Sequence, residues 1–261
     1  PSRRLLAAPP PPRRPQRVIL ATLPRSGSTI LAQLLAQHPL VDYLGESFSW
    51  TAPDARARLD RLQVSEYDLR HRLREATEQV FGSCDPKKRI CMVKVHAEHI
   101  VSPAAVADLV SPDTMVIVLQ RGFEDQLASH QRALRTGMWE ATPSLQRQRA
   151  QLGDAACNHV DCYRDPHRIL DRETAWETRR TWYRSLADLN TTKLWIHTEK
   201  VFADPERVAR RIARWLELGR FQPSLATAEA ALAARLNGGT NAHTRDEHPR
   251  SAYLYSSRKI K

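Results

Sequence analysis

The sequence predicts an α/β fold of three layers, with a central parallel sheet flanked by helices. Short apolar runs alternate along the chain with segments whose apolar residues recur at helical spacing. This alternation is typical of parallel strands that are joined by crossover helices. A hydrophobic content of 41% in a chain of 261 residues is enough for one large core. We therefore expect a single folded domain over residues 17–261.

The first residues of the chain differ from the rest. Residues 1–16 contain the runs PPPP and RRP and show no apolar periodicity. Such a segment cannot bury a core, so we expect a disordered Pro/Arg-rich stem. The chain begins with proline rather than methionine. We interpret it as a fragment or a mature form, upstream of which a signal peptide or a membrane anchor could lie.

The first strand and the first helix enclose a short polar loop. Residues 18–23 form a continuous apolar run, which is typical of a strand buried on both faces. Residues 24–29, with the sequence PRSGST, follow at once, and apolar residues then recur at helical spacing over 30–35. The order is therefore strand, glycine-containing loop, helix.

The rest of the chain continues the alternation. Three further strands are expected at Arg89–Val95, Met115–Gln120 and Lys193–Thr198. One or two helices are expected within residues 54–80. Further helices are expected over 124–135, around Trp176 and Trp182, and after Asp204, which can cap a helix. Residues 137–170 show no regular pattern, and we interpret them as an insertion into the domain.

The net charge of +11 indicates attraction to polyanions such as phosphorylated cofactors, nucleic acid or acidic glycans. The alternative is a basic surface without a specific partner. The sequence contains no recognisable nucleic-acid motif, so no nucleic-acid partner is expected. No apolar run approaches the roughly 20 residues of a membrane span.

The cysteines and one sequon indicate a secretory compartment. Cys157 and Cys162 lie in the polar stretch CNHVDC, where we expect a local disulfide, and the four cysteines do not have the spacing of a zinc site. Asn190-Thr191-Thr192 is an N-glycosylation sequon. We therefore expect a secretory lumen, with the cytoplasm as the alternative.

The loop between the first strand and the first helix has the chemistry of a phosphate site. The helix dipole and the free N–H groups of the first turn favour an anion there. Gly27 lets the backbone approach the anion, and Arg25 supplies a forked cation. Ser26, Ser28 and Thr29 add hydroxyl donors. An ordinary turn is the alternative for so short a motif.

A P-loop kinase or nucleotide hydrolase is a second possibility for this loop. Those proteins need a GxxxxGK[ST] loop, whose lysine binds the β- and γ-phosphates. The chain has no GK[ST] sequence, and an arginine precedes the loop glycine. The sequence therefore argues against ATP hydrolysis.

The segment LPRSGSTIL resembles the 5′-phosphosulfate-binding loop of the sulfotransferases, and it is especially similar to that of the Golgi carbohydrate and tyrosylprotein sulfotransferases. The resemblance implies a P-loop-like fold. It also implies an enzyme that transfers the sulfuryl group of 3′-phosphoadenosine 5′-phosphosulfate (PAPS) to an acceptor hydroxyl. Residues 25–29 would hold the 5′-phosphate and sulfate end of this co-substrate.

Two further segments are similar to the family. Arg121 ends an apolar strand and Ser129 follows eight residues later, as in the 3′-phosphate site of the family, although this chain has Arg-Gly-Phe in place of the usual Arg-Asp-Pro or Arg-Asp-Gly. The segment TEKVFADPERVARRIARWLEL resembles a conserved strand end and helix of the family, with Glu199 at the glutamate position. We interpret the last similarity as architectural.

The resemblance offers two candidates for the base that takes the acceptor proton. Glu46 lies 21 residues beyond Arg25, the offset of the catalytic glutamate in the Golgi enzymes. His96, in Lys94-Val95-His96, resembles the catalytic histidine of the cytosolic sulfotransferases. Glu46 is preferred, and His96 stays open. Lys94 shares a strand face with His96 and would stabilise charge on the sulfate and the leaving phosphate.

The resemblance also implies the partners of the chain. We expect an acceptor hydroxyl on a carbohydrate, with protein tyrosine as the nearest alternative, and residues 137–170 would face the acceptor. No metal is expected, because the protein can supply the positive charge. The Golgi lumen is the expected location. A binding module for polyanions without catalytic activity is the alternative to an enzyme. Such a module would not explain the two predicted phosphate sites.

Overall fold

The computed structural model describes residues 15–50, 52–136 and 171–238. Most of the predicted stem and the whole predicted insertion at 137–170 lie outside the described residues, as do Cys157 and Cys162. None of the described helices combines the length and the apolar character that a membrane crossing needs.

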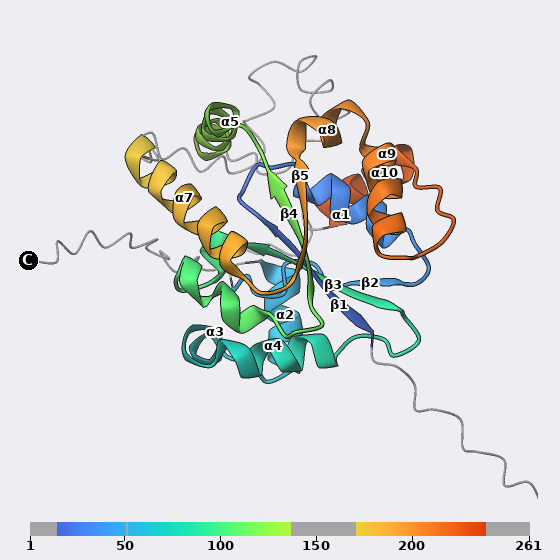
Figure 1. Ribbon diagram of the computed structural model, residues 1–261, viewed down its shortest axis with the longest axis horizontal. Helices are drawn as coiled ribbons and strands as arrows, with labels where there is room; N and C mark the ends of the chain where they lie inside the picture. Colours follow the sequence, from blue (N-terminus) through green and yellow to red (C-terminus); the bar gives the residue numbers. More distant parts are fainter. Residues whose placement is uncertain (1–14, 51, 137–170, 239–261) are drawn as a thin grey trace, which may run out of the picture.

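A five-stranded parallel sheet forms the centre of the fold, which confirms the predicted class (Figure 1). Its spatial order is β2-β3-β1-β4-β5. The strands are β1 (Gln16–Thr22), β2 (Val41–Tyr43), β3 (Ile90–His96), β4 (Met115–Gln120) and β5 (Thr192–His197). The sequence predicts all of these strands except β2, which has only three residues and is too short to show a pattern.

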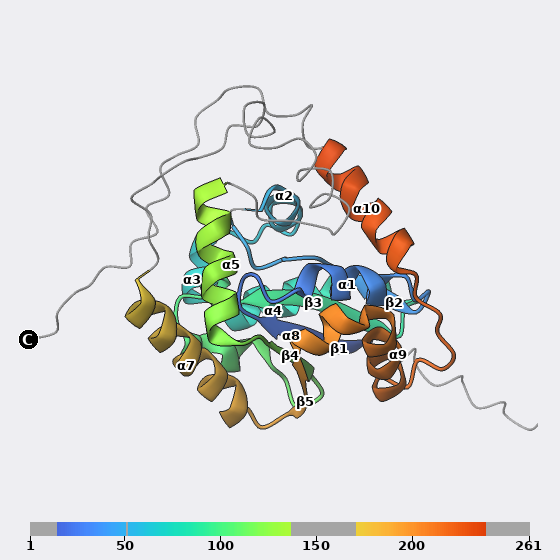
Figure 2. The same cartoon turned by 90° about the horizontal axis from the view of Figure 1, so that it is seen from above.

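Helices cover both faces of the sheet, as Figures 1 and 2 show from two directions. On one face lie α1 (Ser28–Ala36), α9 (Pro205–Trp215) and α10 (Leu225–Gly238). On the other face lie α2 (Pro53–Arg61), α3 (Glu66–His71), α4 (Leu73–Gly82) and α7 (Arg172–Asp188), with the 3₁₀ turn η2 (Pro103–Leu109). The remaining elements follow strand ends: η1 (Ala97–His99), α5 (Phe123–Thr136) and α8 (Thr198–Ala203).

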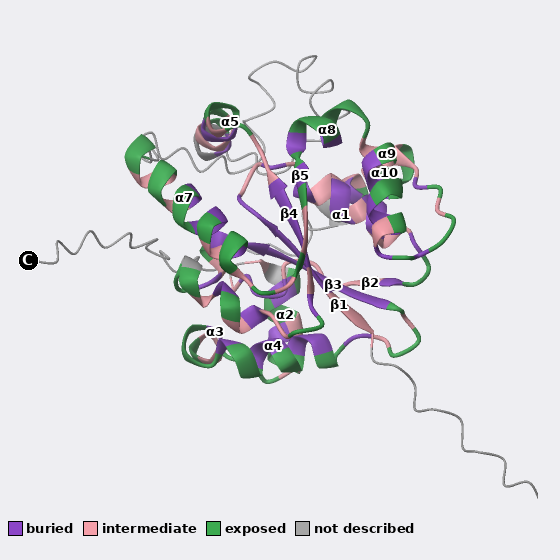
Figure 3. Ribbon diagram, viewed as in Figure 1, coloured by how far each residue is buried: buried purple, intermediate pink, exposed green. Residues whose placement is uncertain are grey.

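Two apolar cores lie between the sheet and its helical layers, and the buried strands run between them (Figure 3). Every residue of β3 is buried, because β3 pairs with β2 on one side and with β1 on the other. Lys94 therefore lies in the interior of the sheet and is not an edge-strand lysine in solvent. Trp182 of α7 is fully buried in one core, whereas Trp176 on the same helix is largely exposed.

Several elements differ in detail from the sequence predictions. The segment predicted to hold one or two helices, 54–80, contains three. Thr198, predicted as the last residue of a strand, begins the short helix α8 instead. Asp204 caps α9 as predicted, since its Oδ1 accepts a hydrogen bond of 2.9 Å from the main-chain N–H of Arg207. A disulfide joins Cys84 to Cys91, a pairing that the sequence did not indicate.

Candidate active site

The predicted functional residues meet at the carboxyl edge of the sheet. The loop at 24–29 follows β1, Glu46 follows β2, Lys94 and His96 end β3, and Arg121 follows β4. In a parallel sheet all of these strand ends face the same side, which is where ligands of open α/β folds bind. The topology therefore gathers residues that are up to about a hundred positions apart in the sequence.

The phosphate loop has the geometry that an anion needs. Gly27 has a φ of +71° and stands at the N-terminal cap of α1, where no side chain caps the helix. A Cβ atom on Gly27 would lie 3.0 Å from Cε1 of Phe202. The Oγ of Ser26 is buried and has no hydrogen-bond partner within the described part of the chain. An anion at the first turn of α1 would meet this donor and the helix N–H groups.

Two contacts from α8 and α5 hold the loop in place. Thr198 Oγ1 donates a hydrogen bond of 2.9 Å to the main-chain oxygen of Ser26, and Gln126 Nε2 donates one of 3.1 Å to that of Pro24. Glu199 Oε1 accepts a 3.0 Å hydrogen bond from the N–H of Gly122. This bond connects α8 to the end of β4, so the structure gives Glu199 an architectural contact, as the sequence analysis expects.

The residues predicted to bind the 5′-phosphate and those predicted to bind the 3′-phosphate contact each other. Arg121 NH1 donates a hydrogen bond of 2.7 Å to the main-chain oxygen of Arg25, and Arg25 Nε donates one of 3.3 Å to Ser129 Oγ. The Arg121 guanidinium also lies over the Phe202 ring, 5.2 Å from its centroid. The sequence predicts two separate pockets. The structure instead places their residues in contact, because β1 and β4 are adjacent strands.

A buried ion pair lies beside the loop. The Lys94 ammonium contacts Glu46 Oε1 and donates a 3.1 Å hydrogen bond to Thr29 Oγ1. The main chain brings the pair together, since the N–H of Lys94 donates a 2.8 Å hydrogen bond to the oxygen of Gly45. Gly45 has a φ of +69°, and this turn directs the chain after β2 toward the end of β3. Lys94 thus joins the phosphate loop to Glu46.

Two histidines complete the surroundings of Glu46. His96 Nε2 lies 3.5 Å from Glu46 Oε1, and His99 Nε2 lies 3.6 Å from Glu46 Oε2. Burial alone would raise the pKa of the Glu46 carboxyl, but the hydrogen bond from His96 and the charge of Lys94 lower it well below its usual value. Burial lowers the pKa of both histidines. Near neutral pH the site therefore holds a carboxylate, an ammonium and two neutral imidazoles.

Glu46, His96 and His99 offer ligand atoms within 4.8 Å of one another, a spacing that a metal site could have. The sequence singles out Glu46 and His96 but does not indicate that His99 joins them. The Lys94 ammonium already contacts Glu46 Oε1 and would repel a metal ion there. The main-chain N–H of His96 donates to His99 Nδ1, so the lone pair of the His99 ring faces away from Glu46. The residues fit a hydrogen-bonded carboxylate better than they fit a metal centre.

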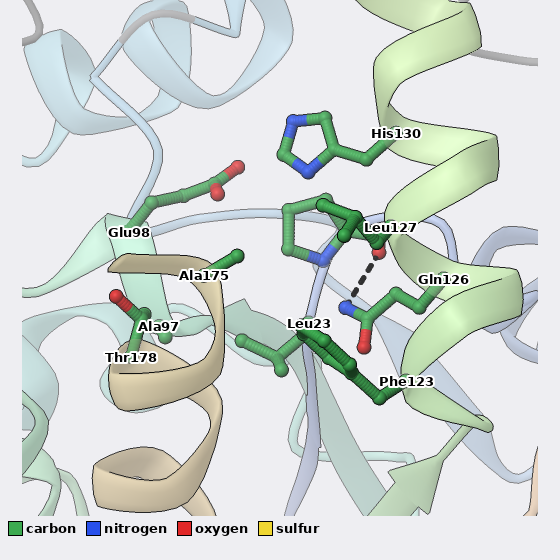
Figure 4. A pocket seen from close by; sticks show the side chains of 10 residues that line it. Leu23, Ala97, Glu98, Phe123, Gln126, Leu127, His130, Ala175 and Thr178 are labelled. Carbon is green, nitrogen blue, oxygen red and sulfur yellow. Dashed lines mark hydrogen bonds between the residues drawn. The ribbon is translucent and has the colours of Figure 1, made fainter. Parts of the chain in front are cut away.

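A cavity of about 60 Å³ opens beside these groups, between the ends of β1 and β3 and the helices α5 and α7 (Figure 4). Its walls are mainly apolar and include Leu23, Phe123 and Leu127. Glu98 and His130 point toward each other across it in Figure 4. Burial lowers the pKa of His130 to about 4, and the positive charge of Arg25 adds to this effect. His130 is therefore neutral near pH 7.

Sequence reasoning did not single out His99, Glu98 or His130. His99 and Glu98 belong to the 3₁₀ turn that follows β3, and a turn of three residues has no periodic pattern. His130 directly follows Ser129 on α5, but nothing in the sequence says which way a helical side chain faces. These three residues lie near the predicted site residues only in the folded chain, so the sequence alone does not indicate them.

The fold brings the predicted phosphate-binding residues together at the carboxyl edge of a parallel sheet, where ligands of open α/β folds bind. The model of the sulfotransferase family matches residues 17–223, most of the chain. The chain belongs to this family and is a PAPS-dependent sulfotransferase. A search of curated proteins found no match.

Solved structures with a similar fold include other sulfotransferases. The enzyme from Alicyclobacillus acidocaldarius is 16% identical with a TM-score of 0.50, and the alignment covers 87% of this chain and 92% of that one. STF9 from Mycobacterium avium is 17% identical with a TM-score of 0.38, covering 91% and 70%. STF1 from Mycobacterium tuberculosis H37Rv is 14% identical with a TM-score of 0.43, covering 86% and 72%. The first of these supports the fold.

Gly27→Ala tests the geometry of the phosphate loop. The new methyl group would contact the Phe202 ring, and the left-handed backbone disfavours any residue with a Cβ by about 1–2 kcal/mol. We expect a loss of that size in the free energy of unfolding, measured with urea, and weaker calorimetric binding of 3′-phosphoadenosine 5′-phosphate. Gly82→Ala is the matched control, because its Cβ meets no atom within 4 Å. Equal effects of the two substitutions would contradict the assignment.

Proposed function

We propose that this enzyme transfers the sulfuryl group of PAPS to a hydroxyl of a carbohydrate, with Glu46 as the base. The observation that carries the proposal is the position of Lys94, whose ammonium contacts both Thr29 of the phosphate loop and Glu46. One cation therefore lies between the predicted site of the sulfate and the predicted base. Sulfuryl transfer needs positive charge at that point.

The residues around the loop would bind the two ends of the nucleotide. Residues 25–29 would surround the 5′-phosphate and the sulfate, and the orphaned Oγ of Ser26 would gain a partner there. Arg121 and Ser129 would bind the 3′-phosphate. To do so, Arg121 would exchange its hydrogen bond to the Arg25 carbonyl for one to the phosphate, which is a stronger charge-assisted bond.

The surroundings of His96 favour Glu46 as the base. His96 Nε2 faces Glu46 Oε1, so its proton is directed at the carboxylate. The other ring nitrogen, Nδ1, is buried and has no hydrogen-bond partner among the described residues. The hydroxyl of an acceptor substrate could therefore not reach a lone pair on either nitrogen of His96. Glu46 is partly exposed and has free lone pairs. His96 would then act as a donor to Glu46.

Lys94 would connect binding to catalysis. PAPS supplies a sulfuryl group whose bond to the 5′-phosphate oxygen breaks as a bond to the acceptor oxygen forms. Lys94 would move from Glu46 toward the negative charge of the sulfate and the departing phosphate. The pKa of Glu46 would rise as this cation leaves, since burial then weighs more heavily. Glu46 would become a better base and take the acceptor proton.

The chain supplies the positive charge that a metal would otherwise provide, so we propose a reaction without a metal. Arg25, Lys94 and Arg121 all lie at the nucleotide end of the site. This distribution also distinguishes the site from that of a P-loop kinase, which binds magnesium with its nucleotide.

The acceptor and the compartment are two further parts of the proposal. The similarity of the loop and of the Glu46 offset to the Golgi enzymes supports a carbohydrate acceptor, and protein tyrosine is the second candidate. The cavity beside Glu98 and His130 is where we place the group that carries the hydroxyl. The disulfide between Cys84 and Cys91 supports an oxidising lumen such as the Golgi, with the cytoplasm as the alternative.

Glu46→Gln and His96→Ala separate the two candidate bases. With PAPS saturating, we expect Glu46→Gln to lower kcat by about a hundredfold to ten-thousandfold, the usual contribution of a general base. We expect a smaller loss for His96→Ala, because it removes a donor to the base. Glu66→Gln, on the exposed helix α3, is the control. Normal turnover by Glu46→Gln would rule out Glu46, and normal turnover by both would rule out both assignments.

A transfer screen with PAPS that carries radiolabelled sulfate tests the reaction and the acceptor together. Neutral glycans, acidic glycans, tyrosine peptides and small phenols would be incubated without magnesium. We expect labelled glycan as the product. Labelled tyrosine peptide would favour the second candidate, and release of phosphate from ATP with no sulfate transfer would contradict the proposed function.

A further inference from the structure

His99 lies next to the proposed base and has no role in the mechanism given above. It ends η1, the turn that directly follows β3, and its side chain is only 6% exposed. Its Nε2 lies 3.6 Å from Glu46 Oε2, just beyond hydrogen-bond length, and such contacts at active sites often shorten when the substrates bind. Its ring meets the ring of His96 edge-on, with 4.9 Å between centroids.

The main chain determines which nitrogen of His99 carries the proton. The N–H of His96 donates a hydrogen bond of 3.2 Å to His99 Nδ1, so Nδ1 must present its lone pair. In a neutral ring the proton is then on Nε2. A proton on Nδ1, in the other tautomer or in the imidazolium, would face the amide hydrogen of His96. His99 is therefore a neutral donor whose protonated Nε2 lies 3.6 Å from Glu46 Oε2.

Glu46 consequently has different partners on its two oxygens. Lys94 and His96 contact Oε1, whereas His99 faces Oε2. If Lys94 moves to the sulfate, Oε1 loses its strongest partner and becomes available to the acceptor proton. A donor on Oε2 would then prevent the carboxylate from rotating.

We propose that His99 is a positioning residue, which is held as its Nε2–H tautomer by the main chain of His96 and fixes Oε2 of Glu46 so that Oε1 faces the acceptor. This inference rests on the proposed function, because it needs Glu46 to be the base. The other charged or titratable groups that face Glu46 are Lys94, His96 and Glu98, and all three stay unchanged in the tests below.

The tautomer can be observed directly in the wild-type protein. Nitrogen-15 NMR of the histidine rings distinguishes a protonated Nε2 from a protonated Nδ1 and needs no acceptor. We expect His99 to carry its proton on Nε2 and to have a pKa well below that of an ordinary histidine, because burial lowers the pKa of its ring. A proton on Nδ1, or a charged ring at neutral pH, would overturn the proposal. Binding of added zinc with loss of the His99 ring proton would overturn the proposal as well.

The functional test compares His99→Ala with His99→Gln, at saturating PAPS and acceptor. We expect His99→Ala to lower kcat by about tenfold to a hundredfold, the effect of losing one hydrogen bond to a charged group. The affinity for 3′-phosphoadenosine 5′-phosphate should not change. Without the donor the pKa of Glu46 rises, so the acidic limb of the kcat profile should move to higher pH. The Gln side chain can donate from a similar position and should restore much of the activity.

Two controls make the outcomes distinct. His71→Ala removes an exposed histidine from α3 and should leave kcat and its pH profile unchanged. A His99→Ala enzyme with normal kcat and an unmoved acidic limb would overturn the positioning role alone. Normal turnover by Glu46→Gln would instead remove the base, so that the proposed function would fail and this inference with it.

Discussion

The buried contact between Lys94 and Glu46 is the interaction on which the rest of the site depends. The Lys94 side chain is only 4% exposed, and a charge so far from water needs a partner. Glu46 is that partner, and Thr29 supplies a hydroxyl to the same ammonium. Glu46 follows β2, Lys94 lies in β3 and Thr29 lies in the first turn of α1, so the contact fixes three parts of the fold around one point. It is also a contact that a bound anion can compete for.

The phosphate loop shows a similar dependence on a ligand. The Arg121 guanidinium donates a hydrogen bond to the main-chain oxygen of Arg25, and the Arg25 side chain donates one to Ser129. Both arginines therefore lie at the loop, where a bound anion would offset their positive charge. A nucleotide with phosphates at its 3′ and 5′ positions would supply one negative group to Arg25 and another to Arg121.

The sequence predicts those parts of the molecule that have a local pattern. Residues 18–23 are continuously apolar, PRSGST follows them directly, and Arg121 stands at the end of an apolar run, so the loop and the cation could be identified without a structure. β2 could not be predicted, because a three-residue strand has no period. Yet β2 is what aligns Gly45 with Lys94 and turns a distant glutamate into a neighbour of the lysine.

The histidine at position 99 illustrates the second limit. Its sequence neighbourhood gives no hint of a role, because the orientation of its ring depends on one main-chain N–H three residues earlier. The disulfide between Cys84 and Cys91 is similar, since it joins the turn after α4 to β3 and depends on how these two elements pack. Local sequence specified the elements and their order. The pairing of elements specified which side chains meet.

The most direct test of this account is the pKa of the Glu46 carboxyl in the wild-type protein and in Lys94→Met, measured by carbon-13 NMR. The account predicts a clear rise in Lys94→Met, because burial still raises the pKa while the charge that lowers it has been removed. The acidic limb of turnover should move in the same direction, and kcat should fall. The same pKa in both proteins would contradict the claim that Lys94 controls the base.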